Sequence, residues 1–268
     1  MRIATWNVNS VTARLPRLHE WLDLVEPDVL CLQETKTADF PSEGVEQRGY
    51  EVAHVGDGRW NGVAILSRVG LEDVTAAFAE QPGYANEDED ALLALPVVES
   101  RAVGATCGGL RVWSLYVPNG RSVGHPHYDY KLGWLAALRA ALAPEVAAGP
   151  FVVTGDFNIA PTDDDVWDPA AFVGSTHVTA RERQALADLR ALGLRDVEPR
   201  ALKGRNFTYW DYRAGMFHKG MGMRIDLVYA NDAVTVTDAW VDREARKGTG
   251  PSDHAPVVVD LDLTDRGP

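Results

Sequence analysis

Cysteine and long apolar runs are scarce in this chain of 268 residues. The two cysteines, Cys31 and Cys107, stand inside apolar runs without metal-ligand spacing, so we expect two reduced core thiols in a cytoplasmic protein. No stretch reaches the roughly 20 apolar residues that a membrane span needs. The N-terminus enters a strand-like run directly, without the features of a signal peptide. These absences predict a cytoplasmic protein with no membrane partner.

Positive charge is also scarce. The chain has 26 Lys and Arg against 39 Asp and Glu, a net charge of −13, and only five of the basic residues are lysine. Because phosphate contacts need basic side chains, this balance alone argues against a DNA-binding protein. However, acidic residues cluster at 86–90 and 163–165, where they can form solvated faces, and others belong to a candidate metal site. We expect any affinity for nucleic acid to be modest and salt-sensitive.

Short β-rich runs recur along the chain, with three helical patterns between them. Several runs are continuously apolar, which is typical of central strands covered on both faces. The expected strands are 2–8, 29–33, 62–67, 110–117, 151–154, 225–229, 235–241 and 257–263. The expected helices are about 14–24, 128–142 and 180–192, the last with Gly193 as C-cap. Without a linker or repeat, the sequence predicts one domain over residues 1–268, with two packed sheets and helices outside.

Asp253 and His254 stand side by side just before the apolar run 257–259. Burying an unpaired charge is costly, so we expect both to face a polar cleft. Asp226 lies inside another apolar strand and needs a partner. His254 is the natural one, since an Asp–His pair fixes the imidazole tautomer and raises its basicity. The alternative, a histidine hydrogen-bonded in the core, leaves Asp253 unexplained.

Other strand ends carry polar residues as well. Asp156 and Asn158 follow an apolar strand two residues apart, on one face. Glu34 closes an earlier strand, and hard divalent cations favour carboxylate oxygen. Asn7 and Tyr116 stand at two further ends. Each has an ordinary explanation alone, as a turn former, a solvated acid or a structural tyrosine, but their convergence would make a metal-assisted phosphate-cutting site.

Taken in chain order, these residues resemble the exonuclease III family of DNA-repair nucleases, in the endonuclease/exonuclease/phosphatase superfamily that includes DNase I. The matching segments span residues 5 to 257 in family order, so the resemblance covers essentially the whole chain. They read WNVNS, LQET, NGVAILSR, YVPNG, GDFNIAPTDDDV, TYWDYR, GMRIDLVYA and PSDHAPV.

The resemblance implies a four-layered α/β sandwich of two packed mixed β-sheets flanked by helices. It also implies a requirement for Mg²⁺ or Mn²⁺ and hydrolysis of DNA phosphodiesters that leaves 3′-hydroxyl ends. Family members act as 3′–5′ exonucleases, clean 3′ ends and cut at abasic sites. The implied partner is double-stranded DNA, especially abasic or 3′-blocked, and the implied protein is a monomer associated with the nucleoid.

Site roles follow from the same resemblance. Glu34 would be the principal metal ligand, Asp156 would position or deprotonate the attacking water, and His254 would stabilise the phosphate. Tyr116 could stabilise the phosphate or the leaving oxygen. The residues implied at the metal are Glu34, Asn7, Asp253, Asp156 and Asn158. The residues implied in catalysis are Asp156, His254, Tyr116, Asp226 and Asn158. The identity of the general base and the number of ions stay open.

The aromatic segment 206–213 is either core or a DNA-facing loop. In this family the corresponding loop forms a wedge near the damaged nucleotide, where an apolar surface would suit a baseless sugar. Met223 stands where some relatives have a bulky aromatic, which leaves open the balance between abasic-site cutting and 3′ trimming. Arg213 and Lys219 would meet flanking phosphates. The residues implied in substrate binding are Asn119, Asn9, Tyr209, Trp210, Arg213 and Met223.

Two other functions stay open. The first is a superfamily phosphatase or phosphodiesterase acting on a phosphate ester other than DNA, such as an inositol phosphate. The second is a catalytically silent DNA-binding scaffold. The presence of Glu34, Asp156 and His254 argues against the scaffold, which would have lost at least one of them.

Overall fold

The computed structural model describes residues 1–85 and 95–263 of the protein. The acidic run at 86–90 lies outside the described residues. The second acidic run forms a short 3₁₀-helix, η1 (Asp163–Asp165). The expectation of a solvated face is wrong for Asp165, because this residue is buried and its carboxylate pairs with Arg224 at 2.6 Å.

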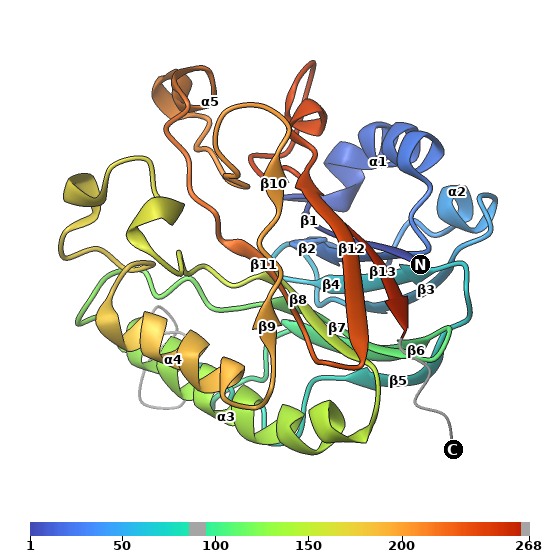
Figure 1. Ribbon diagram of the computed structural model, residues 1–268, viewed down its shortest axis with the longest axis horizontal. Helices are drawn as coiled ribbons and strands as arrows, with labels where there is room; N and C mark the ends of the chain where they lie inside the picture. Colours follow the sequence, from blue (N-terminus) through green and yellow to red (C-terminus); the bar gives the residue numbers. More distant parts are fainter. Residues whose placement is uncertain (86–94, 264–268) are drawn as a thin grey trace.

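Two sheets lie face to face in the described chain (Figure 1). The first has the strand order β10-β12-β13-β1-β2-β4-β3, and the second has the order β5-β6-β7-β8-β11-β9. Strands of the first sheet are β1 (Arg2–Asn7), β2 (Val29–Gln33), β3 (Glu51–Val55), β4 (Val63–Ser67), β10 (Arg200–Ala201), β12 (Val234–Val241) and β13 (Val257–Leu263). Strands of the second are β5 (Glu72–Ala76), β6 (Ala102–Cys107), β7 (Leu110–Tyr116), β8 (Phe151–Asp156), β9 (Arg195–Asp196) and β11 (Asp226–Ala230). Both sheets mix parallel and antiparallel pairs, as at β1 and β8.

Helices cover the outer face of each sheet (Figure 1). On the first sheet these are α1 (Val11–Val25) and α2 (Glu43–Glu46). On the second they are α3 (Pro126–Ala148) and α4 (Ala180–Arg190). The short helices α5 (Met216–Lys219), η2 (Pro169–Phe172), η3 (Arg213–Gly215) and η4 (Arg243–Arg246) lie in connections. The expected four-layered α/β sandwich is confirmed.

Apolar side chains fill three layers of core. The central layer lies between the sheets and includes Ile3, Ile65 and Val112. A second layer joins α1 and α2 to the first sheet, and a third joins α3 and α4 to the second. Both cysteines are buried in the central layer as free thiols. None of the helices in the described ranges has the length and apolar character that crossing a membrane requires.

Helix ends differ from their expected places for local reasons. Helix α1 begins three residues earlier than expected, because the Ser10 hydroxyl accepts a hydrogen bond from the Ala13 N–H at 3.3 Å. Helix α3 begins at Pro126, whose fixed φ suits the first helical position. Helix α4 ends at Arg190, and Gly193, with φ of 93°, closes the following turn instead of capping the helix. Strands β3, β5, β6, β9 and β10 were not anticipated.

Candidate active site

Polar ends of strands from both sheets meet at one edge of the sandwich. Residue Asn7 ends β1 and pairs with Gln33, so Glu34 follows directly beside it. Asp156 ends β8 and pairs with Asp226 at the start of β11. The Asn7 Nδ2 donates to Glu34 Oε1 at 2.8 Å and to Asp156 Oδ2 at 2.9 Å. This one amide therefore connects the two carboxylates across the two sheets.

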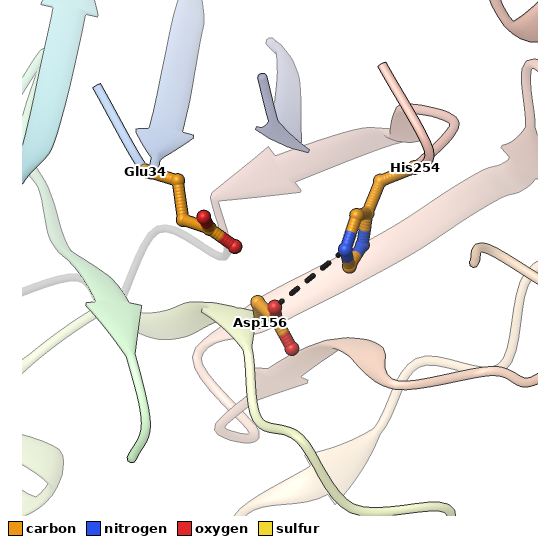
Figure 2. A group of neighbouring side chains, drawn as sticks. All are labelled: Glu34, Asp156 and His254. Carbon is orange, nitrogen blue, oxygen red and sulfur yellow. Dashed lines mark ion pairs between the residues drawn. The ribbon is translucent and has the colours of Figure 1, made fainter. Parts of the chain in front are cut away.

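Glu34, Asp156 and His254 point toward one another in Figure 2. Each offers one potential ligand atom, and these atoms all lie within 4.8 Å of one another. The His254 Nε2 is 3.8 Å from Asp156 Oδ2. Two carboxylates at this spacing suit a hard divalent cation, so the donor set fits the metal that the sequence implied. Asp253 is not part of this group, and its Oδ1 accepts instead from Asn9 Nδ2 at 3.1 Å.

The expected pair of Asp226 and His254 is confirmed. Asp226 Oδ2 lies 2.8 Å from His254 Nδ1, and both side chains are buried. Burial alone would lower the pKa of His254, but the carboxylates of Asp226 and Asp156 outweigh it and raise that pKa to about 10. The imidazole is therefore a cation at neutral pH, with Nδ1 held by Asp226 and Nε2 directed toward the other carboxylates.

The two metal-site carboxylates have different proton affinities. Burial, with Asp226 and Glu34 nearby, raises the pKa of Asp156 to about 7 against the opposing effect of His254. Burial also acts to raise the pKa of Glu34, but Lys36 and Asn7 outweigh it and leave that pKa lowered. Glu34 is thus a permanent anion, whereas Asp156 can exchange a proton near neutrality. Two neighbouring carboxyl groups whose pKa values differ in this way are typical of sites in which one group acts as an acid and the other as a base.

Two amides lie next to Asp156. Asn158 follows β8 with φ of 52°, and its N–H donates to Asp156 Oδ1 at 2.9 Å. Asn119 follows β7, and its Nδ2 donates to Asn158 Oδ1 at 3.1 Å. Because β7 and β8 are parallel neighbours, both amides reach the same edge. Asn119 and Asn158 therefore contact each other beside Asp156.

Tyr116 and Lys36 complete the charged surroundings. The Tyr116 phenol has its pKa raised, first by burial and then by Glu34. The guanidinium of Arg101 lies 4.8 Å from the centre of the Tyr116 ring. Lys36 was not anticipated, although its Nζ lies 2.7 Å from Glu34 Oε2 and donates to Asn9 Oδ1 at 2.6 Å. The sequence could have indicated Lys36, because this lysine stands two positions after Glu34, a candidate metal ligand.

Four of the expected substrate residues, those in segment 209–223, lie in three different surroundings. Tyr209 and Met223 line a cavity of about 410 Å³ that reaches the catalytic edge, since the Tyr209 ring lies 4.9 Å from the His254 ring. Arg213 is exposed and pairs with Asp211. The placement of Trp210 on a DNA-facing surface is wrong: only 1% of this residue is exposed, because it packs in the core against Phe217 and Val241.

The family follows from the match of residues 4–254 to the endonuclease/exonuclease/phosphatase family. The chain belongs to this family. It is 30% identical over 280 residues to exodeoxyribonuclease III of Haemophilus influenzae, covering 97% of this chain and 100% of the relative. The family membership thus extends across the whole sandwich.

Solved structures of the family are similar in fold. The 3′–5′ exonuclease NExo of Neisseria meningitidis has 36% identity and a TM-score of 0.88, covering 98% of this chain and 100% of that one. NExo is also described as a 3′ phosphatase bound to a product DNA hairpin. An AP endonuclease from Archaeoglobus fulgidus has 32% identity and a TM-score of 0.86, with coverage of 98% and 100%. Within the endonuclease/exonuclease/phosphatase family, the chain is therefore a hydrolytic nuclease of the exonuclease III type.

Proposed function

We propose that this protein is a Mg²⁺-dependent DNA-repair nuclease that acts on 3′ ends and abasic sites of double-stranded DNA and leaves 3′-hydroxyl ends. The observation that carries the proposal is the group Glu34, Asp156 and His254, held together by Asn7 and Asp226. It stands in a chain similar to an exodeoxyribonuclease III and to a 3′–5′ exonuclease. We also propose that the protein is a monomer and is associated with the nucleoid.

The residues divide the chemistry among them. Glu34, Asp156 and Asn7 would hold the cation, which when bound would polarise the phosphoryl oxygen and offset developing charge. Mg²⁺ is favoured because these groups offer hard oxygen ligands, and Mn²⁺ can share them. Asp253, bonded to Asn9, would act at the rim of this group.

Proton transfer falls to Asp156 and charge stabilisation to His254. Asp156 would orient the attacking water and accept its proton. The His254 Nε2–H would donate to a phosphate oxygen as negative charge builds. Asn158 and Asn119 would hold the scissile phosphate through their amides, and Tyr116 would stabilise the leaving oxygen.

Substrate choice would depend on the cavity beside His254. Tyr209 and Met223 offer it an apolar wall that could receive a terminal or baseless sugar. Arg213 and Lys219 would contact phosphates of the duplex. The relative described as a 3′ phosphatase supports a 3′-phosphate as one accepted blocking group.

A direct assay tests the proposal. The protein would be incubated with Mg²⁺ and three DNA duplexes: one with an abasic-site analogue, one with a 3′-phosphate, and one that is blunt and undamaged. An inositol phosphate would serve as the fourth substrate. We expect incision or 3′ trimming that stops when EDTA is added. Phosphate release from the inositol compound without any change in the DNA would instead support a phosphatase for other esters.

The variant Asp156→Asn tests the role proposed for Asp156. It keeps the shape of the side chain but removes its charge, so we expect a folded protein whose kcat is lower by about 100- to 10,000-fold. Asp232→Asn is the control, because Asp232 follows the end of β11 that is opposite to Asp226, is 81% exposed in its side chain and pairs with Arg195 of β9. Near-normal turnover by Asp156→Asn would contradict the role given to Asp156.

A further inference from the structure

A buried ion pair lies behind the two amides that follow β7 and β8. Lys131 of α3 and Glu182 of α4 are both 0% exposed in their side chains, and Nζ lies 2.5 Å from Oε1. Neither residue belongs to the group that binds the metal or accepts the proton. Buried ion pairs add little net stability over well-packed apolar side chains, so stability alone does not account for this one.

The Lys131 ammonium binds the main chain of both amide residues. Its Nζ donates to the Asn158 carbonyl at 2.8 Å and to the Asn119 carbonyl at 3.2 Å. With the bond to Glu182, all three ammonium protons have acceptors. One cation therefore fixes the spacing between two loops that come from different strands.

Glu182 anchors this cation from the other side. Its Oε1 also accepts from Thr176 Oγ1 at 2.7 Å and from the His177 N–H at 2.9 Å. Its Oε2 accepts from the N–H and the hydroxyl of Thr179, which caps α4. The carboxylate is thus held by helix and loop together, and it cannot move without disturbing both.

We propose that the Lys131–Glu182 pair is a positioning device, which sets the distance between the Asn119 and Asn158 side chains and so the place where they hold the scissile phosphate. This inference rests on the proposed function, because it assigns the phosphate to these amides. Lys131 binds the carbonyls of the two residues, and their side chains contact each other, because Asn119 Nδ2 donates to Asn158 Oδ1. A displacement of about 1 Å in such a contact can cost about 100-fold in rate.

The test removes both charges together. Lys131→Met alone would leave an unpaired buried carboxylate, which is strongly destabilising. The double variant Lys131→Met/Glu182→Gln removes the charge pair at similar volume. It also removes the one donor that the two carbonyls share, and leaves each carbonyl with a separate neighbour, Thr176 for Asn119 and His177 for Asn158. We expect a folded protein, by circular dichroism and thermal unfolding, with kcat for 3′-end trimming lower by about 10- to 100-fold and KM changed by less than about threefold.

A second charge pair supplies the matched control. Arg111 near the start of β7 and Glu145 near the end of α3 join that helix to the sheet far from Lys131, with Nε and Oε2 2.6 Å apart. Arg111→Met/Glu145→Gln should keep its kcat within about twofold of wild type. Any loss of activity through general weakening of the α3–sheet contact would appear in this control as well.

Coupling to Asn158 separates positioning from a merely structural role. In the wild-type background Asn158→Ala should reduce kcat strongly, but in the double variant the same change should cost at least about tenfold less. The inference would be overturned if Asn158→Ala reduced kcat by the same factor in both backgrounds. It would also be overturned if the double variant folded and kept the kcat of the wild type. If the double variant does not fold, Lys131→Arg replaces it: the charge stays, but the longer planar guanidinium cannot reach all three acceptors, and the same loss of kcat is expected. A wild-type protein that cuts no DNA would instead contradict the proposed function.

Discussion

Single residues of this site obtain their chemical character from a few close neighbours. His254 would be an ordinary histidine without Asp226, whose carboxylate lies 2.8 Å from its Nδ1. Thr208 fixes Asp226 in turn, because its hydroxyl accepts from the backbone N–H groups of Ile225 and Asp226 at 3.1 Å each. The orientation of the imidazole is therefore determined by a chain of contacts that begins outside the catalytic group.

Asp226→Asn tests this dependence. The carboxylates around His254 raise its pKa to about 10, so the imidazolium persists through neutral pH. Replacing the closest one by an amide lowers that pKa, and the charged form is then lost at a lower pH. We expect kcat at neutral pH to fall by about 100-fold or more, and the alkaline limb of the kcat–pH profile to move toward acid. An unchanged alkaline limb would show that His254 is not the group whose deprotonation ends activity.

At the scale of elements, the site depends on the close approach of β7 and β8. Gly155 has φ of 146°, and a Cβ added there would lie 1.9 Å from the Leu115 carbonyl oxygen of the neighbouring strand. Only glycine fits this position. The next residue is Asp156, so the same close approach that joins the strands also places the catalytic carboxylate.

Gly155→Ala should therefore be costly. Both the positive φ and the clash with backbone oppose a side chain, and we expect a loss of at least about 2 kcal/mol in the free energy of unfolding, measured by urea denaturation. Gly133→Ala is the control, because Gly133 lies within α3 and a Cβ there meets nothing within 4 Å. That change should stabilise the protein by about 0.5–1 kcal/mol. Equal midpoints for the two variants would contradict the packing described for β8.

The central strands could be predicted from the sequence, but the edge strands could not. Continuous apolar runs such as 151–154 and 257–263 admit few other structures, whereas β5 is mostly exposed and β9 and β10 have two residues each. The pair of Asp226 and His254 was predictable because a carboxylate in an apolar strand requires a partner. The burial of Trp210 and the position of Lys131 behind two loops depend on tertiary packing, which no local pattern encodes.

At the scale of the whole molecule, charge opposes the proposed substrate. The net charge of −13 repels DNA, and the chain has 26 Lys and Arg against 39 Asp and Glu. Lys36 is engaged with Glu34 and Asn9, and Arg213 is 86% exposed in its side chain but pairs with Asp211. Binding should therefore rest on a small number of phosphate contacts in a narrow region.

The number of phosphate contacts can be measured from the salt dependence of kcat/KM. We expect log kcat/KM to fall linearly with log salt concentration, with a total loss of about 10- to 100-fold between about 50 and 200 mM, as a few phosphate contacts would give. Arg213→Gln should reduce the magnitude of the slope by about 1. Arg195→Gln, on the short strand β9 and paired with Asp232, should leave it unchanged. A salt-independent rate would exclude electrostatic contact with the DNA backbone.

The arrangement of β1 between β2 and β13 has a consequence for protein synthesis. The N-terminal ammonium donates to the Leu261 carbonyl at 2.8 Å, and Asn7 and His254 belong to one site although they lie near opposite ends of the described chain. A nascent chain on the ribosome carries Glu34 and Asp156 long before His254 emerges and β13 can pair. A chain that ends before residue 254 therefore lacks both His254 and the strand that pairs with β1, so the site is complete only when translation has passed both.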